Sequence, residues 1–131
     1  MRKVLLAAAL LCIAASPALS QSAIPSRNGS AVITTGNTYQ LLASRNGGRR
    51  SLTIENNNST GNCLIEISGL IQVGDTTATT YTISGITVTA AQASILLLPG
   101  GAYTRYYPYL PTDPIVGTCA STSASIYLDV Q

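Results

Sequence analysis

The chain contains no histidine, no phenylalanine and no tryptophan, and its single lysine is Lys3. Without histidine, the usual general base of a serine or cysteine catalytic triad is missing, and no later lysine replaces it. A zinc site is disfavoured for the same reason, and Asp75 in "VGDTT" is a lone acid that suits a loop better than a calcium site. These absences predict a protein that is not an enzyme and has no cofactor and no metal.

Charged residues make up only 9% of the sequence, and beyond residue 20 the two signs balance. The basic residues of that part are Arg27, Arg45, Arg49, Arg50 and Arg105, and the acidic residues are Glu55, Glu66, Asp75, Asp113 and Asp129. A neutral chain offers no electrostatic footprint for nucleic acid or an anionic membrane. Weak repulsion between copies suits a protein that assembles.

Only one long hydrophobic run is present, at residues 4–15. It follows Arg2 and Lys3 and precedes a small-residue site that ends at Ser20, which is the pattern of a signal peptide. The run is shorter than the about 20 residues that a membrane-spanning helix needs. We expect residues 1–20 to be removed on export, together with Cys12. Residues 21–131 should then form a single β-sandwich domain in the periplasm or outside the cell, with no membrane insertion.

Cys63 and Cys119 are the cysteines that remain after this removal. Strand alternation puts Cys63 on the same face as Ile65, and Cys119 on the same face as Ile115, so both sulfurs can point into one core. Two cysteines in an oxidising compartment usually pair. A disulfide closing this loop would stabilise the fold by about 4 kcal/mol in the chain-entropy model; two buried free thiols are the alternative.

Strand and turn patterns fill the rest of the chain. Residues 46–48, Asn-Gly-Gly, lie between "TYQLLAS" and "RSLTIEN" and predict a hairpin, with Leu52 and Ile54 facing inward. The segments "TYTIS" and "ITVTA" predict a second hairpin around Gly85. The continuous run "ILLLPGG" predicts a strand buried on both faces, and "AAQAS" allows one helical turn.

The last strand is expected to point Ile126, Leu128 and Val130 inward. No segment sustains a helical period of 3.6 residues. The fold class is therefore all-β, a small antiparallel β-sandwich or jelly-roll-like barrel of about eight or nine strands.

Scattered polar residues support only weak site hypotheses. Glu66 and Asp129 are expected on outward strand faces, where they could meet as a carboxylate pair, although exposed polar positions explain them equally well. Arg45, Arg49 and Arg50 are expected to form a solvated hairpin tip, with anion binding as the alternative.

Residues 100–114, "GGAYTRYYPYLPTDP", hold four of the seven tyrosines between paired glycines and three prolines. The prolines are expected to keep this segment extended. Because neighbouring side chains of an extended segment point to opposite faces, Tyr106 and Tyr107 cannot both be buried. The tyrosines either cap the sandwich or form a contact surface, which is a role that tyrosine and arginine often fill. The residues of the candidate contact surface are Tyr103, Arg105, Tyr106, Tyr107 and Tyr109.

The ordered blocks "TTGNTYQLL", "RRSLTIENNN", "CLIEISG", "ILLLPGGAYTRYYPYLPTDPIVGTC" and "IYLDVQ" resemble a group of small, mostly uncharacterised proteins of tailed phages, prophages and alphaproteobacteria. The resemblance covers nearly all of the chain beyond the signal peptide, which the phage members lack. It implies a virion-associated or surface β-domain and no reaction.

Two functions of different classes follow from these observations. The first is a structural or assembly protein, a phage-derived decoration-like or surface domain that forms a homo-oligomer or joins another surface or virion protein. The second is a secreted binding module that presents the tyrosine and arginine residues to a glycan or a host surface. The sequence favours the first and places the protein in the periplasm, outside the cell or on a virion.

Overall fold

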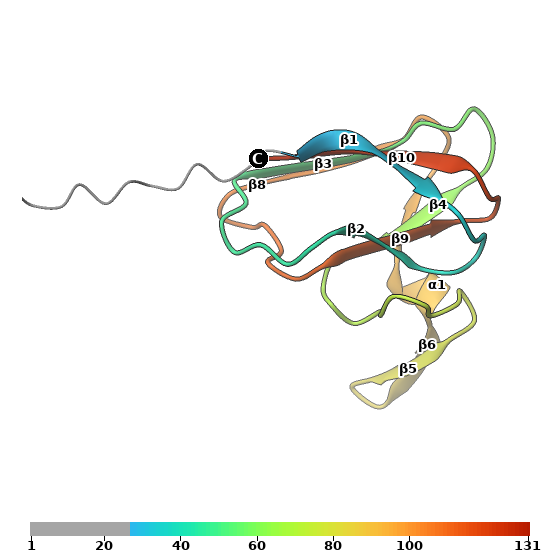
Figure 1. The fold of residues 1–131 in the computed structure, drawn as a ribbon. Coiled ribbons are helices and arrows are strands. Elements are labelled where there is room, and N and C mark those ends of the chain that lie inside the picture. Colours follow the sequence, from blue (N-terminus) through green and yellow to red (C-terminus); the bar gives the residue numbers. More distant parts are fainter. Residues whose placement is uncertain (1–26) are drawn as a thin grey trace, which may run out of the picture.

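The structure is a computed structural model that describes residues 27–131 (Figure 1). Ten strands and one short helix make up this part of the chain, in place of the eight or nine strands expected. The predicted signal peptide, its cleavage after Ser20 and the fate of Cys12 lie outside the described residues. The elements are β1 (Arg27–Ile33), β2 (Gln40–Ala43), β3 (Ser51–Asn56), β4 (Cys63–Glu66), β5 (Thr80–Ile83), β6 (Ile86–Thr89), α1 (Ala90–Ala93), β7 (Ile95–Leu97), β8 (Ala102–Tyr106), β9 (Ile115–Cys119) and β10 (Ala124–Val130).

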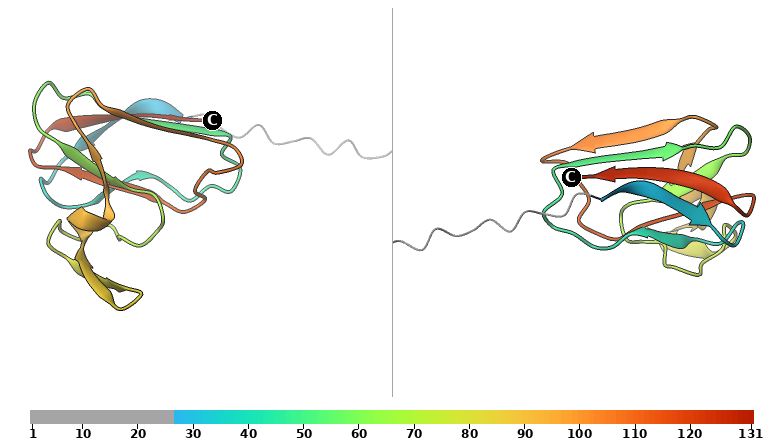
Figure 2. Two further views of the ribbon diagram at one scale, coloured as in Figure 1. Left: turned by 180° about the vertical axis from the view of Figure 1, so that it is seen from behind. Right: turned by 45° about the horizontal axis from the view of Figure 1, so that its top comes forward.

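Two four-stranded antiparallel sheets lie one above the other in Figure 1 and form a small β-sandwich, as predicted. The first sheet has the strand order β1-β10-β3-β8, and the second has the order β2-β9-β4-β7. The views in Figure 2 show that successive segments of the chain pass back and forth between these layers. Strands β8 and β1 are the edges of the first sheet, and β2 and β7 are the edges of the second.

The core between the sheets follows from the alternation of the strands. Leu52 and Ile54 of β3 are fully buried, and Ile126, Leu128 and Val130 of β10 are buried with them, so these inward sets are confirmed. Each buried side chain of this size contributes about 1.5–3 kcal/mol relative to exposure. The inner cluster is completed by Ile33, Ala43, Cys63, Ile65, Leu97, Ile115, Cys119 and Ala124.

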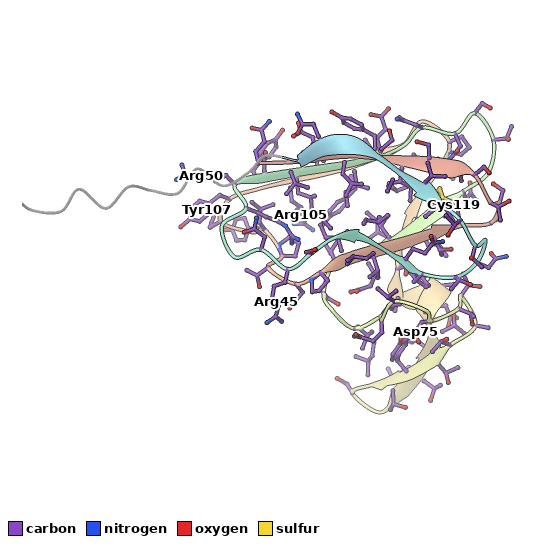
Figure 3. All side chains as sticks on the ribbon, viewed as in Figure 1. Arg45, Arg50, Asp75, Arg105, Tyr107 and Cys119 are labelled. Carbon is purple, nitrogen blue, oxygen red and sulfur yellow. A yellow bond between two sulfur atoms is a disulfide. The ribbon has the colours of Figure 1, made fainter. Side chains whose placement is uncertain are left out.

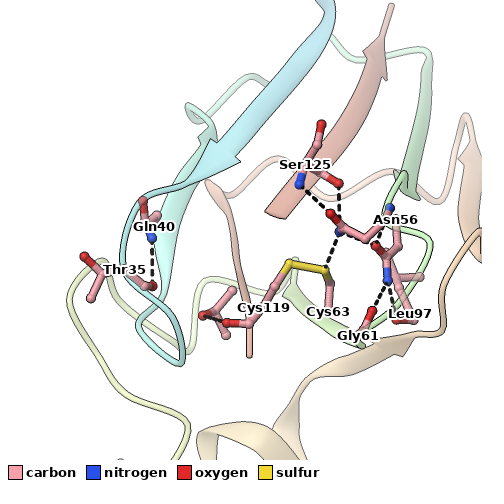
Figure 4. The surroundings of a disulfide bond; sticks show 10 residues. Thr35, Gln40, Asn56, Gly61, Cys63, Leu97, Cys119 and Ser125 are labelled. Carbon is pink, nitrogen blue, oxygen red and sulfur yellow. Dashed lines mark hydrogen bonds between the residues drawn. A yellow bond between two sulfur atoms is a disulfide. The ribbon is translucent and has the colours of Figure 1, made fainter. Parts of the chain in front are cut away.

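A disulfide joins Cys63 and Cys119, which confirms the predicted pair. The two residues are direct partners on the neighbouring strands β4 and β9, with 4.1 Å between their Cα atoms. Buried amides surround the bond: Asn56 donates to the carbonyls of Gly61 and Leu97 at 3.0 and 3.1 Å (Figure 4). The disulfide and these hydrogen bonds fix the loop after β3 onto the end of the sandwich.

A second, smaller cluster covers the outer face of the second sheet. It contains Tyr39, Ile71, Ala90 and Val116, and the helical turn α1 supplies one of its members, as "AAQAS" allowed. The predicted hairpin β5–β6 follows this cluster and projects from the sandwich in Figure 1. Its turn places Ser84 and Gly85 both at positive φ, the conformation of a tight hairpin turn.

The hairpin predicted at residues 46–48 is wrong. Strand β2 pairs with β9 in the second sheet, whereas β3 pairs with β10 and β8 in the first, so the intervening loop crosses between the layers. Asn46 still makes a local turn, because its side chain accepts a hydrogen bond from the Gly48 N–H at 2.9 Å. The Asn-Gly pair therefore forms a turn, and long-range pairing decides which strands this turn separates.

The run "ILLLPGG" is not buried on both faces. Strand β7 is an edge strand, and Leu96 and Leu98 are 54% and 58% exposed, whereas Leu97 between them is buried. A continuous apolar run indicates burial only when another element covers its second face, and the outer side of this edge has no such cover. Within the described residues, no helix is long and apolar enough to cross a membrane.

Candidate functional site

The candidate site lies where β8 ends and the chain turns back. Tyr109 N–H donates to the Tyr106 carbonyl at 3.1 Å, and Tyr107 N–H donates to the Arg50 carbonyl at 3.0 Å. The Tyr107–Pro108 peptide is cis. The prediction that the prolines keep this segment extended is therefore wrong at residues 106–109, where hydrogen bonds close a turn.

Three tyrosine rings stand in solvent at this turn. Tyr106, Tyr107 and Tyr109 are 67%, 76% and 79% exposed, which confirms that at least one of the adjacent pair lies at the surface. None of the three hydroxyls has a hydrogen-bond partner among residues 27–131. These rings add little to the stability of the domain, because the apolar area that they carry remains in water.

Tyr103 and Arg105 behave differently from the three exposed tyrosines. They are the cross-strand partners of Ile54 and Leu52, so both face the inner side of the first sheet at its open edge. Tyr103 packs against the inner core, and Arg105 covers it, with its Nε donating to the Tyr103 hydroxyl at 2.5 Å and its guanidinium carbon 5.4 Å from the ring centre. Of the two roles considered for the tyrosines, Tyr103 therefore has that of a cap on the sandwich. We call Tyr103, Arg105, Tyr106, Tyr107 and Tyr109 together the tyrosine surface.

An open groove of about 500 Å³ runs along the side of the tyrosine surface. Aromatic, cationic, acidic and hydroxyl side chains all contribute to it, which is a mixture suited to a polar ligand with flat apolar patches. Its lining residues are Ile67, Ser68, Tyr103, Arg105, Tyr109, Leu110, Pro111, Thr112 and Asp113.

The loop at residues 44–50, here called the arginine loop, lies beside the tyrosine surface. Arg45 is exposed and pairs with Asp113 at 2.5 Å. Arg49 is only 4% exposed, so the predicted solvated hairpin tip is wrong at this residue. Its guanidinium donates to the carbonyls of Pro111, Asp113 and Ser44 at 2.6–2.9 Å.

The burial of Arg49 has a clear structural reason. Its guanidinium ties the arginine loop to the segment that follows the turn at residues 106–109, here called the tyrosine turn, by donating to backbone carbonyls of both. Burial lowers the pKa of Arg49, and the nearby Asp113 carboxylate opposes that shift. Its Nε is the buried side-chain nitrogen that lacks a hydrogen-bond partner among the described residues.

Positive charge gathers in this half of the molecule, although residues 21–131 are neutral as a whole. Figure 3 shows Arg45, Arg50, Arg105 and Tyr107 in the half opposite Cys119. Composition could not reveal this concentration, because the pairing of β8 with β3 is what sets Arg105 opposite Leu52, two residues after the arginine loop. In the sequence, this concentration is indicated locally by the doublet Arg49-Arg50, which directly precedes a predicted strand.

The acidic residues do not form the carboxylate pair that was considered. Glu66 is 3% exposed on the second sheet, and Asp129 lies on β10 of the first. The Glu66 carboxylate accepts hydrogen bonds from the backbone N–H groups of Ser68, Gly69 and Ile71. Glu66 lies on the outward face of β4, as predicted, because its cross-strand partner Val116 belongs to the second cluster. Its expected exposure is wrong, because that cluster and the loop after its own strand cover it.

Asp75 serves as a hydrogen-bond acceptor in the second cluster. Its carboxylate accepts the hydroxyl of Tyr81 and the Gln72 N–H. Burial, and then the hydrogen bond to Asp75, raise the pKa of Tyr81 to about 12. Among residues 27–131, no three histidine, cysteine or acidic side chains gather as a metal site would require.

Comparison of the chain with models of known protein families, with curated proteins and with solved structures finds no match. The site must therefore be interpreted from its own geometry.

Proposed function

We propose that the protein is an exported, non-enzymatic binding module whose tyrosine surface contacts a partner outside the cytoplasm. The observation that carries this proposal is that Tyr106, Tyr107 and Tyr109 are each at least two-thirds exposed and have no partner for their hydroxyls within the described chain. Tyrosine and arginine are the residues that most often anchor interfaces. This arrangement favours the binding role over the assembly role that the sequence favoured.

The surface is held in a fixed shape before any partner binds. The turn at residues 106–109 is closed by backbone hydrogen bonds, and the buried Arg49 fastens the segment that follows it. A pre-organised surface loses little conformational entropy on binding, so more of the contact energy appears as affinity. An exposed tyrosine that becomes buried by a partner typically contributes about 1–3 kcal/mol to the free energy of binding.

Several observations support a role without catalysis and outside the cytoplasm. The chain has no histidine, and its acids are separated, with Glu66 engaged by its own loop. The signal-peptide pattern of residues 1–20 supports export. Intact-mass analysis of the secreted protein should show a chain that begins at Gln21; full-length protein recovered from the cytoplasm would contradict export.

The binding proposal is tested with purified mature protein on isolated cell envelopes and on immobilised surface polysaccharides. Tyr109→Ala should lower binding about fivefold or more, since it removes an exposed aromatic anchor. Ile86→Ala is the matched control, because Ile86 is 66% exposed at the tip of the β5–β6 hairpin, outside the tyrosine surface. The proposal would be refuted if both variants lose binding to the same extent, or if Tyr109→Ala loses none.

Self-assembly as a structural or virion-associated protein is the second candidate, and strand β7 favours it. Leu96 and Leu98 expose apolar area at an open sheet edge, which is a site where copies can pair. Light scattering of the mature protein should then show an oligomer that Leu96→Lys dissociates. Leu41→Lys, at the opposite edge of the same sheet and 50% exposed, is the control. A monomer at all accessible concentrations would exclude this candidate.

A further inference from the structure

The arginine loop and the tyrosine turn line an open pocket of about 470 Å³. The described residues that line it are Gly47, Gly48, Arg49, Arg50 and Tyr107, which include two arginines and no acid. We infer that this pocket binds the anionic group of an acidic polysaccharide. This inference rests on the proposed binding function and names the class of its ligand.

Arg49 gives the pocket a fixed positive charge. Its guanidinium is held by three carbonyls and is not paired with a carboxylate, because the described ion pair of this region joins Arg45 to Asp113. A buried charge is screened less by salt than an exposed one. Arginine also stays protonated at neutral pH despite the lowering of its pKa by burial. Arg49 therefore keeps its charge beside the pocket, with the nearby Asp113 carboxylate offsetting part of its field.

Arg50 supplies the donor that a ligand can reach. Its side chain is exposed, while its backbone N–H donates to the Gln131 carbonyl and its carbonyl accepts from Tyr107. The backbone is thus anchored on both sides, and the guanidinium projects from a fixed base. Its planar fork matches a carboxylate or phosphate group in a two-point hydrogen bond. Tyr107 also lines the pocket, and its hydroxyl is a further possible donor to the ligand.

The neighbouring groove indicates a sugar polymer rather than a free anion. Tyr107 lines the pocket and Tyr109 lines the groove of about 500 Å³, so the two spaces lie on either side of one turn. In the groove, Ser68, Thr112 and Asp113 can bond sugar hydroxyls, while the Tyr109 ring can stack on the apolar face of a sugar. An acidic polysaccharide would place its anionic group in the pocket at Arg50 and its sugar rings along the groove at Tyr109.

Calorimetric titration of the mature protein tests this inference with four probes: an oligogalacturonide, dextran, oligothymidylate and inorganic phosphate. The oligogalacturonide should bind, with an affinity that falls as salt is raised, while dextran should not bind. Phosphate alone should bind at least about tenfold more weakly, because it does not reach the groove.

Arg50→Gln is the decisive variant and should lower the oligogalacturonide affinity about tenfold or more. The control is the double variant Arg45→Gln with Asp113→Asn, which removes an arginine from the same loop together with its carboxylate partner and leaves the net charge unchanged, so the loss should stay within about twofold. Circular dichroism and urea denaturation of both variants check that the fold is retained.

Distinct results separate this inference from the proposed function. If dextran binds as well as the oligogalacturonide, or if Arg50→Gln binds normally, the anion pocket is refuted, while a loss with Tyr109→Ala keeps the binding function. If oligothymidylate binds more tightly than the oligogalacturonide, the ligand class is wrong. If no probe binds, and Tyr109→Ala does not alter envelope binding, both proposals fail.

Discussion

The second cluster and the tyrosine surface use the same residue type in opposite ways. Tyr39 is fully buried, and its hydroxyl bonds the Ala90 carbonyl at 3.2 Å and the Ser94 hydroxyl at 2.6 Å. Tyr107 is 76% exposed, and its hydroxyl has no partner among the described residues. In a chain without phenylalanine or tryptophan, tyrosine must serve both as the aromatic of the core and as the aromatic of the surface.

The two arginines of one loop repeat this contrast. Arg49 is buried and donates to three carbonyls, whereas its neighbour Arg50 is exposed with a free-standing guanidinium. Burial with satisfied polar atoms contributes to folding, whereas exposure without partners leaves a side chain available for binding. The position of a residue in the fold, and not its type, therefore decides which of the two roles it has.

The largest expected effect tests the difference between the buried Tyr39 and the exposed Tyr107. Tyr39→Ala should lower the free energy of unfolding by about 3–5 kcal/mol, because it leaves a cavity and unpaired polar groups in the second cluster. Tyr107→Ala should change it by less than about 0.5 kcal/mol. Urea denaturation measures both values, and comparable losses would show that the tyrosine turn is a structural cap.

A smaller effect tests the arginine contrast. Arg49→Met should cost about 1–3 kcal/mol of unfolding free energy, because the three carbonyls lose their donor. Arg50→Met should stay within about 0.5 kcal/mol. The same denaturation experiment compares the two variants. An equally small loss of unfolding free energy for Arg49→Met would mean that water can replace this guanidinium as the donor.

The smallest expected effect is a loss of stability at alkaline pH, which depends on Tyr81 beside the second cluster. The pKa of Tyr81 is raised from its ordinary value of 10.0 to about 12 in the folded protein. Because the folded state holds this proton more tightly, its contribution to stability is complete below pH 10 and is lost as the pH rises toward 12. Denaturation across this range should show the decline, and Tyr81→Phe should reduce it. If the stability of Tyr81→Phe declines by the same amount over this pH range, groups other than Tyr81 cause the decline.

Local alternation was enough to predict much of the fold. The inward faces of β3 and β10 follow from the two-residue period, because one buried face imposes that period on each strand. The same period directs Cys63 and Cys119 into one core, and the expectation of an oxidising compartment adds the bond between them. The β5–β6 hairpin also follows from local signals, since Gly85 can adopt positive φ. These features depend on residues that are close in sequence or share one face.

The errors arose where a distant segment decided the outcome. The Asn-Gly turn was assigned to a hairpin because nothing local shows that β2 and β3 belong to different sheets. Arg49 is buried by carbonyls at residues 111 and 113, and Leu96 is exposed because β7 is an edge. The exposure of at least one of Tyr106 and Tyr107 was predicted from an extended segment, although the chain turns there. The gathering of arginines beside them required the register of β8 on β3.

Hydroxyl-radical footprinting of the mature protein, free and bound to cell envelopes, tests the central claim most directly. Oxidation of Tyr106, Tyr107 and Tyr109 should fall on binding, while Tyr127 on the outer face of the first sheet should be unchanged. The account predicts protection confined to the tyrosine surface and the arginine loop. Unchanged oxidation of these three tyrosines on the envelope-bound protein would contradict it.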